Sequence, residues 1–154
     1  MTEEKPAGEG CMAGSESLKL VAHRGGYDLL FSVSELVEIV AADTLQWETD
    51  DNSGLRACRF RGELLAMPDF TDFLGPAPAE GAMNSHLLVV TGRFAPFGVL
   101  VGDVCGIFAA GQFRYRDLPP MLRVPGRQCY IRLAFRQDKV LLCCDAAGLE
   151  ACGQ

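Results

Sequence analysis

LLVVTGRFAPFGVLVGDVCGI, residues 87–107, is the segment around which we expect the rest of this chain to pack. It begins with an apolar run over residues 87–90, turns through residues 91–93, and returns as a second apolar run over residues 97–104. Two β-rich runs of strand length on either side of turn-forming residues predict an antiparallel hairpin. Because both runs are almost continuously apolar, we expect both faces of the hairpin to be covered. The hairpin is therefore predicted at the centre of a small β protein.

The rest of the chain repeats the same pattern of short β-rich runs separated by turn residues. A turn followed by a strand is expected over residues 34–40, and a hairpin is expected around Arg61 and Gly62. Asp69 and Asp145 can each cap a short helix. In total the sequence predicts nine or ten short strands with turn signals every ~8–12 residues, which is typical of paired barrels or a sandwich. Further strands are predicted over residues 18–23, 27–33, 55–60, 63–67, 129–135 and 139–144.

Length and charge limit the classes of protein that this chain could be. Its 154 residues, 49% of them hydrophobic, suffice for one domain or two closely packed subdomains. The net charge of −6 argues against a nucleic-acid partner, because phosphate binding needs clustered Lys and Arg. No apolar window is long enough for a transmembrane helix and no secretory signal is present, so we expect a cytoplasmic protein without direct membrane insertion. Residues 1–16 are polar and predicted to be a disordered tail, and residues 76–81 are the predicted internal boundary.

The seven cysteines raise the question of metal or thiol chemistry. Their number is odd and no CxxC pair exists, so we interpret them as buried, reduced thiols that act as small hydrophobes. A zinc site usually shows close ligand pairs, and His23 and His86 are isolated. No GxSxG, Walker A, GxGxxG or HExxH motif is present. The sequence predicts no enzyme, cofactor or metal, and a small thiol- or metal-dependent enzyme stays as an alternative on the cysteine count alone.

Three blocks, in order, carry a resemblance to a known family. They are YDLLFSVSELVEIV at residues 27–40, CRFRGELLAMPDFTDFLG at 58–75, and HLLVVTGRFAPFGVLVGDVCGIF at 86–108. The segment Leu118-Pro119-Pro120 and the last strand with its final Asp and Leu, within residues 140–149, follow in the expected places. Together these blocks make residues 18–150 similar to the CheW-like chemotaxis coupling proteins.

The resemblance implies a fold and a domain organisation. The implied fold is all-β, with two small five-stranded β-barrel subdomains that share a hydrophobic core, and one or two short helices. Residues 17–154 would form the CheW-like domain. Its first subdomain would span about residues 24–80, completed by late strands, and its second about residues 81–145.

The resemblance also implies a function without catalysis. Such a protein is an adaptor that couples the cytoplasmic tip of a chemoreceptor, a helical hairpin, to the regulatory domain of a chemotaxis histidine kinase. By position, the receptor- or kinase-binding residues would be Leu36, Glu38, Arg61 and Gly62. An apolar groove with a few charges at its rim suits an amphipathic helix. A divergent CheW-like scaffold in a non-flagellar pathway, serving pili or a regulatory circuit, is the alternative within the same fold.

Overall fold

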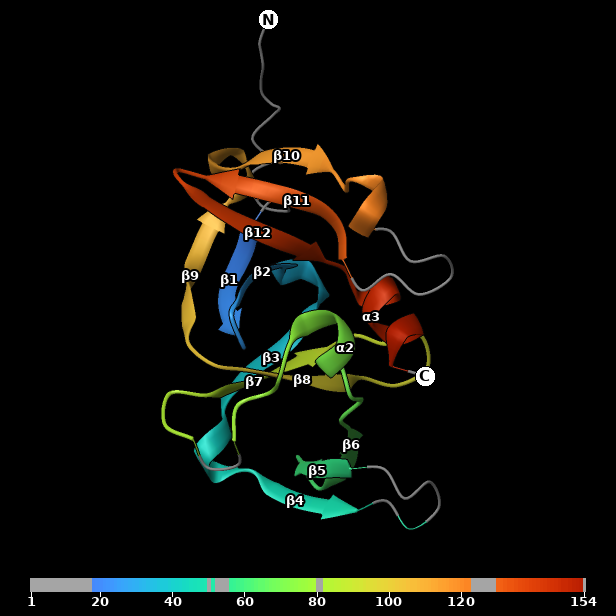
Figure 1. Cartoon of the computed structure of the whole chain (residues 1–154). Helices are drawn as coiled ribbons and strands as arrows, with labels where there is room; N and C mark the ends of the chain where they lie inside the picture. The colour runs from blue at the N-terminus through green and yellow to red at the C-terminus, as the bar shows by residue number, and fades with distance from the viewer. Residues whose placement is uncertain (1–17, 50, 52–55, 80–81, 123–129, 154) are drawn as a thin grey trace, which may run out of the picture.

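The computed structural model describes residues 18–49, 51, 56–79, 82–122 and 130–153. These residues form twelve strands and two short α-helices, arranged as in Figure 1. The predicted disordered tail at residues 1–16 lies outside the described residues. Among the described residues no helix is both long and apolar enough to cross a membrane. The regular secondary structure of the described residues is mostly β, in agreement with the predicted fold class.

The central hairpin forms as the sequence predicts. Strands β7 (His86–Val90) and β8 (Phe97–Val101) pair antiparallel, with His86 opposite Val101 and Val90 opposite Phe97. Every residue of β8 is buried, as is every residue of β7 after His86. Both faces of this strand pair are therefore covered, as the continuous apolar pattern predicts.

The hairpin belongs to a six-stranded sheet in the order β3-β7-β8-β6-β5-β4, which we call the second sheet. All its pairings are antiparallel except that of β6 with β8. Strands β3 to β6 precede residues 80 and 81 in the chain and strands β7 and β8 follow them, and all six lie in this sheet. The subdomain boundary expected between residues 80 and 81 stays a prediction. Its other strands are β3 (Leu36–Ala41), β4 (Gln46–Thr49), β5 (Arg56–Phe60) and β6 (Glu63–Ala66).

The first sheet is built from the two ends of the described chain, in the order β10-β11-β12-β2-β1-β9. Its pairings are antiparallel except for β12 with β2, which run parallel and join the late strands to the early ones. Its strands are β1 (Leu18–Arg24), β2 (Tyr27–Ser32), β9 (Val104–Ala109), β10 (Arg114–Asp117), β11 (Tyr130–Arg136) and β12 (Lys139–Cys144).

The sheets differ from the two five-stranded barrels that the resemblance implies. Each has six strands, and no strand pairing between described residues closes either sheet. Each sheet nevertheless curls strongly, because one short 3-10 helix joins its two edge strands. Helix η2 (Ala42–Thr44) joins β3 to β4, and η3 (Ala110–Gln112) joins β9 to β10. The sequence shows the strands and turns but not whether edge strands exchange hydrogen bonds.

The core is continuous from one sheet to the other through the hairpin. In Figure 1 the hairpin lies between β1 and β2 on one side and β4 and β5 on the other. Alternate residues of β7 and β8 therefore belong to two different clusters. We call the first cluster the shared core; it includes Leu20, Leu29, Phe31, Leu74, Leu88, Val90, Val99, Val101 and Leu149. The second includes Cys58, Leu65, Leu87, Val89 and Leu100.

Short helices complete the fold. Helix α3 (Ala146–Cys152) begins at the predicted cap, where the Asp145 side chain accepts a hydrogen bond from the Gly148 amide at 2.8 Å. Helix α2 (Thr71–Leu74) follows Asp69 by two residues, and its N-cap is Phe70 rather than the predicted Asp69. The remaining 3-10 helices are η1 (Val33–Glu35), which is the predicted turn before β3, and η4 (Pro120–Leu122).

Candidate functional site

Leu36 and Glu38 lie on β3, at one edge of the second sheet. Their side chains are half-buried, and Leu36 packs against the shared core. The intervening residues point outward, with Val37 50% and Ile39 38% exposed. The register with β7 shifts between Leu36 and Glu38, so the strand is irregular at this point. The edge of the sheet thus presents apolar side chains beside one carboxylate.

Arg61 and Gly62 form the two-residue turn between β5 and β6, as predicted. Phe60 pairs with Glu63, and the φ angles of Arg61 and Gly62 are 52° and 82°. Two consecutive left-handed residues are typical of the tight hairpin turn whose twist matches that of the flanking strands. A glycine fits the second position because a side chain with φ near 80° is strained.

The structure brings Glu38 and Arg61 together as an ion pair, although they are 23 residues apart in the sequence. Strands β7 and β8 separate β3 from β6 in the sheet order, so the pair forms because the sheet curls. The Arg61 guanidinium also lies 5.1 Å from the centre of the Phe60 ring. Three of the four predicted site residues, Glu38, Arg61 and Gly62, therefore lie in one place, and Leu36 lies two residues along the same strand.

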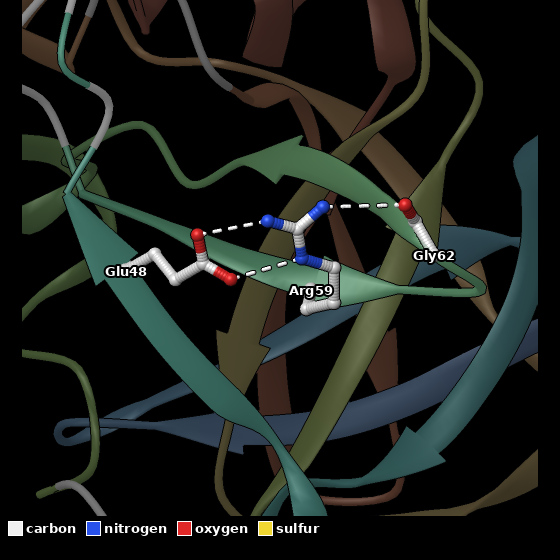
Figure 2. A network of polar contacts seen from close by, with 3 residues as sticks. All are labelled: Glu48, Arg59 and Gly62. Carbon is white, nitrogen blue, oxygen red and sulfur yellow. Dashed lines mark hydrogen bonds and ion pairs between the residues drawn. The ribbon is translucent and has the colours of Figure 1, made fainter.

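A second polar network, which the sequence analysis missed, holds the same turn. Arg59 donates two hydrogen bonds of 2.9 Å to the Glu48 carboxylate and one of 3.2 Å to the Gly62 carbonyl oxygen. Figure 2 shows the three residues from close by. The hydrogen bonds and charge of Glu48 raise the pKa of Arg59 further above its usual value. A bidentate pair of this kind fixes the orientation of both side chains. Only the strand register could have identified Glu48 as the partner.

An apolar hollow of about 230 Å³ lies beside Arg61. Phe94, which precedes the lining residue Ala95 in the sequence, is 91% exposed, and the Arg93 guanidinium lies 5.7 Å from the centre of the Phe94 ring. Exposed aromatic side chains and apolar hollows are both typical of surfaces that bind other proteins. The hollow is lined by Phe60, Arg61, Glu63, Leu64, Leu65, Ala95 and Pro96.

The described thiols and imidazoles do not form a reactive cluster. Cys58, Cys143, Cys144 and Cys152 are buried, as predicted, whereas Cys105 is exposed because it lies on the outer side of the edge strand β9. Burial raises the pKa of the Cys58, Cys143 and Cys144 thiols, which keeps them protonated and weakly nucleophilic. His23 pairs with Asp28, and His86 lies 3.2 Å from the Gly102 carbonyl oxygen. Within the described ranges, no three His, Cys, Asp or Glu side chains are grouped to hold a metal ion.

No family model matches the sequence, and no curated protein matches it. The structure, however, is similar to the crystal structure of the scaffolding protein TtCheW from Thermoanaerobacter tengcongensis, with a TM-score of 0.64. The similarity covers 84% of this chain and 88% of that chain, at 13% sequence identity. The resemblance in the sequence blocks is thus matched by the path of the backbone. The chain has a CheW-like fold.

Proposed function

We propose that this protein is a non-catalytic scaffold that couples a chemoreceptor to a histidine kinase in bacterial chemotaxis signalling. The observation that carries the proposal is the similarity in fold to the scaffolding protein TtCheW over 84% of this chain. The sequence blocks that resemble the coupling proteins support it independently. We place the action of the protein in the cytoplasm, where the receptor tip and the kinase meet.

We assign the receptor contact to the edge strand β3 and the turn at Arg61 and Gly62. Val37 and Ile39 offer apolar contact area, and the Glu38–Arg61 ion pair supplies charge beside it. A helical hairpin can lay an apolar face on such a surface, since apolar anchors supply most of the affinity and charges at the rim set register and association rate. The hollow beside Arg61 can receive one protruding side chain of the partner.

The test is reconstitution from purified components. The chain is mixed with the regulatory domain of the histidine kinase and with a receptor-tip fragment, both from the same genome, and complexes are measured by size-exclusion chromatography and calorimetry. We expect a ternary complex. If the folded chain binds neither partner, the proposed function is wrong.

The variant Arg61→Glu tests the assigned surface. It replaces the ion pair with Glu38 by two facing carboxylates, and we expect receptor-tip binding to weaken at least tenfold, about 1.4 kcal/mol. Because exposed ion pairs contribute only about 0–1 kcal/mol to stability, the melting temperature should change little. Arg114→Glu, an equal charge reversal on an exposed strand of the first sheet, is the matched control. Equal loss of binding in both variants would move the contact away from Arg61.

A further inference from the structure

The loop between β7 and β8 carries the most exposed large apolar side chain among the described residues, Phe94. Its ring is 91% exposed, and the only side chain recorded against it is the guanidinium of the preceding residue, Arg93. Arginine and aromatic side chains are both enriched where proteins bind one another. The two residues therefore form a projection suited to a protein contact, which we call the Arg93–Phe94 knob.

Hydrogen bonds to two other parts of the chain hold the loop in place. The Arg93 amide donates to both oxygens of the Glu150 carboxylate on α3, at 3.1 and 2.9 Å. The Thr91 amide donates to the carbonyl oxygen of Glu35, the last residue of η1, at 2.9 Å. A loop that is already fixed loses little conformational entropy when a partner binds it. The knob is thus prepared for a contact before any partner arrives.

The knob borders the apolar hollow beside Arg61. Phe94 is bonded to Ala95, which lines the hollow, so the Cα atoms of these two residues are only about 3.8 Å apart. The hollow has a volume of about 230 Å³, and an engineered protein cavity of about 150 Å³ holds a benzene molecule. One phenyl ring therefore fits the hollow in size. Its apolar walls are formed by Phe60, Leu64, Leu65, Ala95 and Pro96.

The knob and the hollow carry opposite charges. Arg93 adds a guanidinium to the knob, and Glu63 adds a carboxylate to the lining of the hollow. Both residues are exposed, and neither side chain forms an ion pair or a hydrogen bond with another described residue. The other charged residue of the lining, Arg61, is already paired with Glu38. An arginine and a carboxylate can join through two parallel hydrogen bonds, so these two unpaired groups are complementary.

We propose that two copies of this chain associate about a two-fold axis, with Phe94 of each copy seated in the hollow of the other. Arg93 of one copy then pairs with the partner's Glu63, and symmetry repeats the pair. A knob and a hollow that adjoin on one surface can be self-complementary, because a two-fold rotation places each against the other.

The contact is small, so the dimer should be weak and should form only as the concentration rises. The proposal does not depend on the scaffold function, since it concerns the chain alone. If the chain is also a scaffold, the dimer covers the hollow that we assign to the receptor, so dimerisation and receptor binding would compete.

Sedimentation equilibrium of the full chain tests the association directly. We expect the weight-average mass to rise from that of a monomer towards that of a dimer between about 10 µM and about 1 mM protein. Phe94→Ala removes the ring that fills the hollow and should weaken association at least tenfold. Met83→Ala is the matched control, because Met83 is 87% exposed but lies before β7, at the opposite end of that strand from the knob. It should associate like the unaltered chain.

An exchange of charges tests the pairing across the axis. Arg93→Glu and Glu63→Arg each place like charges at both contacts of a dimer, so each variant alone should associate at least tenfold more weakly. In an equimolar mixture of the two variants, a mixed dimer has opposite charges at both contacts, so association should return to that of the unaltered chain. Circular dichroism verifies that each variant is folded.

Three results would each overturn the proposal. The first is a chain that stays monomeric at the highest concentration, and the second is equal association of Phe94→Ala and Met83→Ala. The third is a mixture of Arg93→Glu and Glu63→Arg that associates no better than either variant alone. A monomeric chain whose Phe94→Ala variant loses receptor-tip binding would assign the knob to the receptor contact and leave the scaffold function standing.

Discussion

At the scale of single residues, the turn between β5 and β6 shows how backbone conformation fixes a candidate contact. Arg61 and Gly62 are both left-handed, and the Gly62 carbonyl is held by Arg59. These features aim the Arg61 side chain toward Glu38 on a strand at the far edge of the sheet. The turn therefore acts as a rigid support for one charged group.

Replacing Gly62 isolates the contribution of this conformation. A Cβ at Gly62 would meet no atom within 4 Å, so Gly62→Ala changes only the backbone preference at φ 82°. We expect a loss of about 1 kcal/mol in the free energy of unfolding, measured by urea denaturation. Gly26→Ala is the control, because it has equal space and no left-handed φ. An equal loss in both variants would contradict this explanation.

Cys144 gives a prediction of pH dependence. Burial raises the pKa of its thiol above the ordinary value of 9.0, so the folded state favours the protonated form. A folded-state pKa above the unfolded one means that this stabilisation is complete below about pH 9 and is lost as the pH rises further. Under reducing conditions, the free energy of unfolding should fall as the pH rises above about 9.

The assignment to Cys144 can be checked by substitution. Cys144→Ala should reduce the slope of stability against pH, whatever its effect on stability at neutral pH. Cys105→Ala should change the slope less, because that thiol is exposed. An unchanged slope in Cys144→Ala would show that other groups cause the pH dependence.

At the scale of secondary-structure elements, the β7–β8 hairpin contributes buried side chains to two of the hydrophobic clusters. Leu88 is fully buried in the shared core, so Leu88→Ala should lower the free energy of unfolding by about 2–5 kcal/mol. Val140→Ala, at a side chain that is 51% exposed on β12, should change it by less than about 0.5 kcal/mol. Chemical denaturation compares the two. Similar losses would mean that the hairpin is not the packing centre.

The same scale shows what could be predicted from the sequence. The hairpin, the turn at Arg61 and Gly62, and the cap at Asp145 were predictable because each depends on residues that are neighbours in the chain. The pairs Glu38–Arg61 and Glu48–Arg59 were not, since each depends on how strands align and curl. The parallel pairing of β12 with β2 and the hollow beside Arg61 arise from long-range packing, which local patterns do not encode.

At the scale of the whole molecule, the β7–β8 hairpin of the second sheet packs against the first sheet in the shared core, so the two sheets should unfold together. Trp47 reports on the edge of the second sheet, whereas far-ultraviolet circular dichroism reports on both sheets. We expect the two signals to give coincident unfolding curves, because β7 and β8 contribute side chains to both clusters. Two separated transitions would show that the sheets are thermodynamically independent.

The division of strands between the sheets also has a consequence for synthesis on the ribosome. The second sheet is drawn from one continuous stretch, residues 36–101, whereas the first needs β1 and β2 together with β12, which ends at Cys144. During synthesis, β1 and β2 are therefore made well before their partners β9 and β12, whereas the strands of the second sheet can already pair with one another. During translation, the apolar faces of these two early strands are the part of the protein most in need of protection by a chaperone.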